Sequence, residues 1–163
     1  MFFALAPMDG LMRGMTFALL ALPALFIAPS LLFSGPVATG SIATALFIGI
    51  VYGLVYLTMR PRGFSVEPGV VTVVFPLWSR RVDGITHAEP MDRDELKRRY
   101  GWQARVGVGG LWGGFGWLYS TKGWMEFYVS RMDGYVLLTR AEGLPLLLSP
   151  ERADVFRATV NPA

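Results

Sequence analysis

The chain has 163 residues, of which 53% are hydrophobic and only 17% are charged. Soluble domains usually carry about 25% charged residues, so this composition, with a mean hydropathy of +0.43, argues against an ordinary water-soluble protein. Lys and Arg exceed Asp and Glu by only three charges, and cysteine is absent. A strongly basic nucleic-acid-binding surface, a disulfide framework, a thiolate nucleophile and a cysteine-ligated metal are therefore not expected.

The first 14 residues are too few to span a bilayer and too apolar for a solvated tail. Their apolar side chains include Phe2, Phe3, Leu5, Met8, Leu11 and Met12. We expect residues 1–14 to form an interfacial segment at the membrane surface, or a strip packed against a partner.

Two membrane-spanning helices are predicted next. No charged residue and no histidine occurs between Arg13 and Arg60, a gap of 46 residues. A helix rises about 1.5 Å per residue and the hydrocarbon core is about 30 Å thick, so about 20 residues span it. The gap therefore predicts a two-helix transmembrane hairpin over residues 15–59, with helices at 15–33 and 41–59.

Two features of these helices bear on their packing. Pro23 and Pro29 are expected to kink the first helix or to end it early. The second helix carries small residues at four-residue spacing, which are Ser41, Ala45, Gly49 and Gly53. The last two form a GxxxG pair, which lets two backbones approach closely in lipid. This stripe is expected to pack against the first helix or to dock another membrane protein.

Positive charges flank the hairpin and are missing from its turn. Arg13 precedes the first helix, while Arg60 and Arg62 follow the second. The positive-inside rule then places both termini in the cytoplasm. The alternative is a cleaved signal peptide over residues 1–33, which the second apolar run disfavours.

The remainder, residues 63–163, consists of short apolar or β-branched runs between turn signals. Strands are expected at 64–66, 70–75, 79–82, 85–88, 115–119, 124–130, 135–139 and 144–148. Glycine-ended connections typical of hairpins lie at 120–123, 131–134 and 141–143. Helices are expected at 92–100, opened by a capping box of Asp92 and Glu95, and after Ser149-Pro150. The pattern predicts a small, mainly antiparallel sandwich or barrel with a C-terminal helix.

Several short sequences between residues 96 and 160 are similar to those of one family. They are Arg99-Tyr100-Gly101, Gly113-Gly114-Phe115-Gly116-Trp117-Leu118-Tyr119, Phe127-Tyr128-Val129-Ser130, Val136-Leu137-Leu138 and Leu148-Ser149-Pro150-Glu151. In these the chain resembles the bacterial pleckstrin-homology-like (PH-like) family, in which a membrane hairpin often precedes the domain. The resemblance implies a seven-stranded half-open barrel closed by a helix, with a role in binding or assembly. Extra glycines and a tryptophan within residues 106–117 depart from the family pattern, and the conformation there stays open.

The sequence contains no recognisable catalytic or metal-binding pattern. His87 is the only histidine, and a metal site usually needs three or four ligands. Asp92, Asp94 and Glu95 cluster at a predicted helix N-terminus, where carboxylates complement the helix dipole. The glycine-rich stretch 107–114 matches neither a P-loop nor a G-x-G-x-x-G pattern. We therefore expect no catalytic, cofactor-binding or metal-binding residues, and no enzyme.

Two sets of side chains are predicted to make contacts outside the domain. Aromatic residues are too dense between residues 102 and 128 for all of them to be buried, so some should face lipid headgroups or a partner. The predicted interface aromatics are Trp102, Trp112, Phe115, Trp117 and Trp124. The basic residues predicted to face headgroups are Arg60, Arg62, Arg80 and Arg81.

Together these features predict a non-enzymatic accessory subunit of the bacterial inner membrane. Its hairpin and PH-like domain would pack against a larger complex, for example a photosynthetic or respiratory one. The expected partners are other integral-membrane proteins and membrane lipids, without nucleic acid and without a cofactor of its own. The alternative is a free-standing, membrane-tethered module that binds lipid or peptide.

Overall fold

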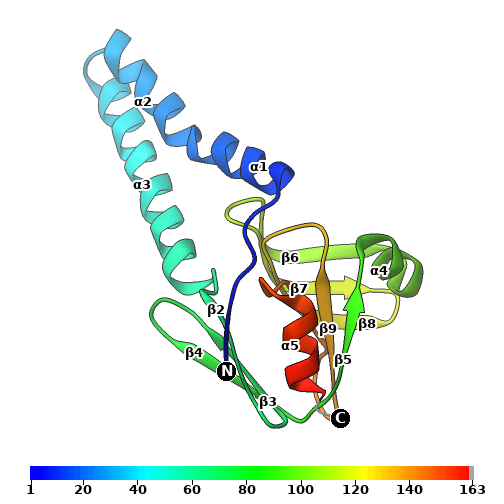
Figure 1. Ribbon diagram of the computed structural model, residues 1–163. Coiled ribbons are helices and arrows are strands. Elements are labelled where there is room, and N and C mark those ends of the chain that lie inside the picture. Colours follow the sequence, from blue (N-terminus) through cyan, green and yellow to red (C-terminus); the bar gives the residue numbers. More distant parts are fainter. Residues whose placement is uncertain (162–163) are drawn as a thin grey trace.

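The computed structural model describes residues 1–161, which form an apolar helical hairpin and a β domain (Figure 1). The hairpin consists of α1 (Gly10–Leu20), α2 (Leu22–Leu32) and α3 (Pro36–Thr58). Gly10–Leu32 and Pro36–Thr58 each have 23 residues, with hydropathies of 2.1 and 1.9, and only 6% of the most apolar part of each is buried. By length and composition both can cross a membrane, and their side chains face outward rather than into a protein core.

The first span bends where a proline was predicted to disturb it. α1 ends at Leu20, Ala21 lies between the two helices, and α2 has Pro23 in its first turn. Because proline has no N–H, it cannot donate to the carbonyl of Leu19, four residues earlier. The hydroxyl of Tyr52 on α3 donates to that carbonyl instead, at 2.9 Å. A backbone group freed inside an apolar region is thus satisfied by the neighbouring helix, whereas α2 continues through Pro29.

The β domain contains two sheets. The four-stranded sheet has the order β1-β2-β3-β4 and comprises β1 (Phe2–Ala4), β2 (Gly63–Glu67), β3 (Val70–Val74) and β4 (Ser79–Asp83). The six-stranded sheet has the order β5-β9-β10-β8-β7-β6 and comprises β5 (Ile85–Met91), β6 (Gln103–Gly109), β7 (Gly114–Ser120), β8 (Gly123–Val129), β9 (Tyr135–Arg140) and β10 (Leu146–Leu148). The helices α4 (Arg93–Tyr100) and α5 (Ala153–Val160) complete the domain.

The N-terminal residues belong to the β domain, which differs from the interfacial segment predicted for residues 1–14. β1 pairs with β2 in antiparallel register, so that Phe3 lies opposite Phe64. Phe3 is buried and packs edge-on against Phe156 of α5, with ring centroids 5.1 Å apart. The apolar character of this segment is explained by burial between a sheet and a helix that are both distant in sequence.

β10 lies between β8 and β9, parallel to the first and antiparallel to the second. The turn at 131–134 therefore does not join a hairpin as predicted, since the chain crosses past the position of β10. All three residues of β10 are buried. A central strand covered on both faces is expected to be continuously apolar, which explains the run of leucines there.

Two apolar layers make up the core. The layer between the two sheets contains Phe64, Phe115 and Leu138, and is closed by Phe156 of α5. The layer between the six-stranded sheet and α4 includes Leu96, Leu118, Met125, Phe127 and Leu137. The six-stranded sheet therefore buries both faces around β8, β9 and β10, whereas no residue of β6 is buried, and α4 and α5 cover different parts of the sheet (Figure 1).

The two predicted helix starts have different outcomes. The cap at Asp92 is confirmed, because its carboxylate accepts from the backbone N–H of Glu95 at 2.6 Å. The prediction that the C-terminal helix starts at Ser149-Pro150 is wrong, because α5 begins at Ala153 and has no side-chain cap. Ser149 is buried, and its hydroxyl accepts from the N–H of Ser130 at 2.9 Å. A serine that satisfies a buried strand end is no longer available to cap a helix.

The hairpin is joined to the β domain through Thr16 of α1. Its hydroxyl oxygen accepts from the N–H of Trp112 at 2.9 Å, and its single proton has two carbonyl acceptors within reach, Gly110 at 2.9 Å and Met12 of the same helix at 2.8 Å. Thr16 is buried at this contact. α1 therefore lies against the β6–β7 turn and bends away from α3, as Figure 1 shows.

Replacing Thr16 with valine should weaken this junction. The change keeps the shape but leaves the Trp112 N–H without its acceptor and removes the only hydroxyl beside the Gly110 carbonyl within the described residues, at a cost of about 1–2 kcal/mol. Denaturant unfolding of the full chain in detergent, followed by tryptophan fluorescence, measures this loss. Thr44→Val is the matched control, because the exposed Thr44 hydroxyl bonds only within α3. Equal stability of the two variants would contradict the proposed junction.

Candidate functional site

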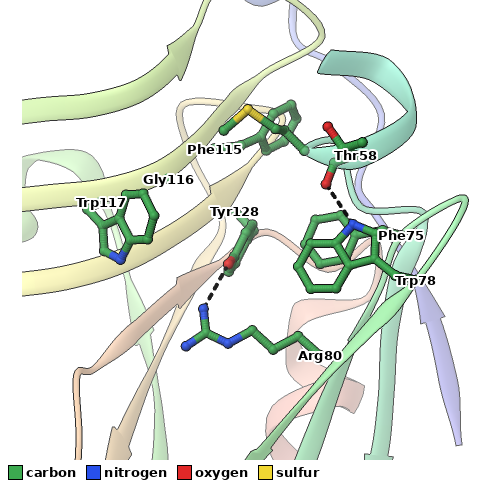
Figure 2. A pocket seen from close by; sticks show the side chains of 9 residues that line it. Thr58, Phe75, Trp78, Arg80, Phe115, Gly116, Trp117 and Tyr128 are labelled. Carbon is green, nitrogen blue, oxygen red and sulfur yellow. Dashed lines mark hydrogen bonds between the residues drawn. The ribbon is translucent and has the colours of Figure 1, made fainter. Parts of the chain in front are cut away.

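A cavity of about 140 Å³ lies where α3 ends against both sheets (Figure 2). We call it the α3 cavity; it is lined by Thr58, Met59, Phe75, Trp78, Arg80, Phe115, Gly116, Trp117 and Tyr128. An apolar cavity of about 150 Å³ can hold a benzene molecule. The α3 cavity therefore has room for one apolar side chain or a short piece of hydrocarbon.

One wall of the α3 cavity is a fixed aromatic cluster. Trp78 stacks on Phe75, with ring centroids 4.2 Å apart and ring planes 6° from parallel. Tyr128 packs edge-on against Phe75, with ring centroids 5.7 Å apart. The indole N–H of Trp78 donates to the carbonyl of Thr58 at 2.9 Å (Figure 2). This bond satisfies one of the free carbonyls at the end of α3 and ties α3 to the start of β4.

Arg80, which also lines the α3 cavity, belongs to a charge pair that links the two sheets. The guanidinium of Arg80 on β4 contacts both carboxylate oxygens of Glu126 on β8, each at 2.6 Å. Glu126 is 3% exposed and the Arg80 side chain 34%. Burial opposes the charge on Arg80, but Glu126 more than offsets it, and the pKa of Arg80 lies above its ordinary value. The ion pair with Glu126 neutralises Arg80 within the domain, and its predicted role in facing lipid headgroups stays a prediction.

The hydroxyl of Tyr128, from the aromatic cluster, lies close to this charge pair. It lies 3.5 Å from Arg80 and 3.4 Å from Glu126, both at the long end of hydrogen bonding. Burial, followed by the negative charge of Glu126, raises the pKa of Tyr128 above its usual value. The hydroxyl therefore stays protonated at neutral pH. The lining of the α3 cavity therefore combines aromatic surface with one phenol and one guanidinium, whose charge is neutralised by Glu126 outside the lining.

The other predicted headgroup residues do not form a cluster with Arg80. The guanidinium of Arg60 lies over the ring of Tyr56, 5.2 Å from its centroid. Arg62 is exposed, and the exposed Arg81 forms an ion pair with Asp83 on its own strand at 2.9 Å. Only Arg60 and Arg62 therefore remain directly beside the end of α3.

The predicted interface aromatics separate into three groups. Phe115 is fully buried in the core, so its assignment to an interface is wrong. Trp112 is half-buried and packs edge-on against Tyr56 of α3, with centroids 5.0 Å apart. Trp102, Trp117 and Trp124 are exposed, at 70%, 45% and 45%.

Trp117 and Trp124 belong to one exposed surface, which we call the aromatic strip. It consists of Val106 on β6, Trp117 and Tyr119 on β7, and Trp124 on β8, all at least 45% exposed. Val106 is paired with Trp117 across the strands and Tyr119 with Trp124, the latter with ring centroids 5.0 Å apart. Since Trp117 also lines the α3 cavity, the strip and the cavity form one continuous surface.

The small-residue stripe of α3 is only partly used in the hairpin. Ala45 is buried, whereas Gly49 and Gly53 are exposed, and a methyl group added at either glycine would meet nothing within 4 Å. Four residues turn a helix by about 400°, so a stripe at this spacing drifts by about 40° with each step. The GxxxG pair has therefore rotated out of the contact with α2 and faces the surroundings of the hairpin.

The acidic residues and the histidine that were considered for catalysis lie apart from the α3 cavity. His87 is exposed on β5, Asp92 caps α4, and Glu95 forms an ion pair with Arg99 at 2.7 Å. Within residues 1–161 no three His, Asp or Glu side chains are grouped so that they could hold a metal ion.

Glu126 is the site residue that sequence reasoning missed. It is the only charged residue in β8, which otherwise consists of apolar and glycine residues. A lone carboxylate in an apolar strand is costly to bury without a partner, so its position was a signal that a cation must lie opposite. The sequence did not indicate which cation, because β4 and β8 belong to different sheets.

No family model matches this chain, and no curated protein or solved structure matches it. Function is therefore inferred from the residues and their arrangement.

Proposed function

We propose that this chain is a non-enzymatic accessory subunit of the bacterial inner membrane that binds a larger integral-membrane complex, such as a photosynthetic or respiratory one. The observation that carries the proposal is the aromatic strip. Trp117, Tyr119 and Trp124 are large apolar side chains held on adjacent strands, and about half of each is exposed. Aromatic anchors on a rigid backbone are typical of the centre of a protein interface.

A second contact surface within the membrane supports a protein partner. Gly49 and Gly53 leave a flat patch on α3 that α2 does not cover. In lipid, where apolar side chains gain little from association, close backbone approach at such patches drives helix pairing. A partner with a transmembrane helix beside α3 and a domain on the aromatic strip would use both surfaces at once.

The same proposal includes the orientation and the fold family. Arg13, Arg60 and Arg62 flank the hairpin on the side of the β domain, which supports a cytoplasmic location for that domain and for both termini. Two packed sheets with α5 closing one end support membership of the PH-like family. The ten strands of residues 1–161 exceed the seven that the resemblance implies.

Substitutions in the two surfaces should release the partner without unfolding the chain. Trp117→Ala combined with Trp124→Ala should reduce co-purification of the partner from native membranes by at least tenfold, because interface tryptophans often contribute 2 kcal/mol or more, about a thirtyfold change each. Gly49→Ile combined with Gly53→Ile should do the same, since the added bulk blocks close approach.

Matched controls separate loss of binding from general damage. Trp102→Ala removes a tryptophan that is more exposed than Trp117 and Trp124 and lies on the α4 side of the domain, away from the strip. Gly40→Ile with Ala43→Ile adds the same bulk to another exposed face of α3. Retention of the partner in both target variants, or its loss in the controls alone, would refute the proposed surfaces.

The α3 cavity favours a second candidate function, a free-standing module that binds lipid or peptide. Its aromatic wall lies directly at the end of a membrane span, where a hydrocarbon chain or an apolar side chain could enter. In that case the full chain would purify alone, with tightly bound lipid or peptide visible by native mass spectrometry. Phe75→Trp, which fills the cavity, would then remove the bound molecule.

A further inference from the structure

A second depression lies on the other side of the six-stranded sheet, between α4, the start of β6 and the β8–β9 connection. It has a volume of about 330 Å³, and its polar character differs from that of the α3 cavity. We call it the basic depression; it is lined by Arg93, Asp94, Leu96, Lys97, Gly101, Trp102, Gln103, Arg105, Met132 and Tyr135.

The basic depression gathers cations that lack acidic partners. Arg93 and Lys97 are four residues apart on α4 and therefore share one face of that helix, and Arg105 comes from β6. Within residues 1–161, none of the three lies within 4 Å of a carboxylate, in contrast to Arg99, which pairs with two glutamates. Asp94 is the single carboxylate in the lining, so three cations leave a formal surplus of two positive charges.

A buried hydroxyl lies at the same place. Tyr135 is 4% exposed, and within the described chain its hydroxyl contacts only the thioether sulfur of Met132, at 3.9 Å. A thioether is a weak acceptor, so this O–H is available to a stronger one. Burial raises the pKa of Tyr135 to about 12, although Arg105 and Arg93 lower it from nearby. The hydroxyl therefore remains a donor at neutral pH.

The remaining acidic groups near Tyr135 are already engaged. The carboxylate of Asp9 accepts from the N–H groups of Met12 and Met132, both at 2.7 Å. Asp133 forms an ion pair with Arg131. Neither is free to neutralise the cations of the basic depression. Because Asp9 caps α1, the basic depression also lies next to the start of the first apolar helix.

We propose that the basic depression binds a phosphate-bearing ligand. Two guanidinium groups and one ammonium group suit a doubly charged oxyanion. Each guanidinium can donate two parallel N–H hydrogen bonds to two oxygens of one phosphate. The Tyr135 hydroxyl supplies a further donor, and the exposed Trp102 provides a flat apolar surface for the rest of the ligand. The phosphate could come from a soluble compound or from a lipid headgroup beside α1. The site does not depend on the proposed role of the aromatic strip.

Pyrophosphate is a suitable probe for the full chain in a zwitterionic detergent. Calorimetric titration should show saturable binding that weakens as the salt concentration rises. Arg105→Gln and Arg93→Gln should each weaken binding about tenfold, the effect expected for loss of one charge-assisted contact. Tyr135→Phe should weaken it severalfold with the fold retained. Arg98→Gln is the matched control, because Arg98 is exposed on α4 outside the basic depression and should change binding less than twofold.

Reconstitution into lipid discs distinguishes the two sources. If discs containing phosphatidylglycerol abolish pyrophosphate binding while phosphatidylcholine discs do not, the headgroup occupies the site. If pyrophosphate binds equally in both, a soluble phosphate compound is the ligand. Absence of saturable binding up to about 10 mM, or an equal loss in Arg98→Gln and Arg105→Gln, would overturn the proposal.

Discussion

Replacing Arg80 with methionine is expected to lower the free energy of unfolding by about 3 kcal/mol. The variant leaves the carboxylate of Glu126, which is 3% exposed, without its counterion. Removing one partner of a buried ion pair typically costs about 3–5 kcal/mol, because the remaining charge stays buried and uncompensated. The low end applies here, since the Arg80 side chain is 34% exposed and water can reach part of the site.

A double variant isolates the cause of this loss. Arg80→Met with Glu126→Leu removes both charges and should recover most of the lost stability, because an apolar pair of similar volume is often as stable as the ion pair. Arg81→Met is the matched control on the same strand, where an exposed ion pair with Asp83 should contribute little. Denaturant unfolding of the full chain in detergent measures all three. If Arg80→Met is as stable as Arg81→Met, the ion pair does not hold the two sheets together.

Replacing Gly116 with alanine is expected to cost about 3 kcal/mol or more, and the loss should be visible as reduced thermal stability or failure to fold. Gly116 lies opposite Gly107 on the neighbouring strand, and the two have φ values of +134° and +135°. An added methyl group on Gly116 would approach the carbonyl oxygen of Val106 closer than 3.0 Å. Strained backbone alone costs about 1–3 kcal/mol, and a collision with main chain cannot be relieved by a rotamer change.

Gly109→Ala provides the control for this prediction. Gly109 lies on β6, the strand that pairs with that of Gly116, but an added methyl group there would meet nothing within 4 Å, and its φ is not in the left-handed region. Its substitution should change stability by less than about 0.5 kcal/mol. Comparable melting temperatures for Gly116→Ala and Gly109→Ala would show that the close strand approach at Gly107 and Gly116 is not required.

The helical hairpin and the strands other than β1 and β6 could be predicted because they depend on short stretches of sequence, whereas the strand at Gln103–Gly109 was not expected. The 46-residue gap in charge indicated both spans, and Pro23 marked the bend because a missing N–H acts within one helical turn. The pairing of β1 with β2 and the insertion of β10 could not be predicted in this way. Both depend on contacts between segments far apart in the chain, for which hydrophobic periodicity carries no information.

The exposed aromatic residues of the candidate site could be predicted from local composition, whereas the ion pair between Arg80 and Glu126 could not. The excess of aromatic residues indicated that some must be exposed, and Trp117 and Trp124 are. Which of them would be buried depended on strand register, and Phe115 lies on the covered part of the same face of β7 as Trp117. Arg80 was interpreted as a surface charge because its partner, Glu126, lies 46 residues away. Burial of a charge pair is a tertiary property, visible only once the sheets are placed.

Purification of the full chain from its native membrane in gentle detergent, followed by mass spectrometry, tests the central claim most directly. The proposed function predicts a single large complex that contains this chain at fixed stoichiometry and that dissociates when Trp117 and Trp124 are both replaced with alanine. Recovery of the chain alone, with or without bound lipid, would contradict a role as an accessory subunit.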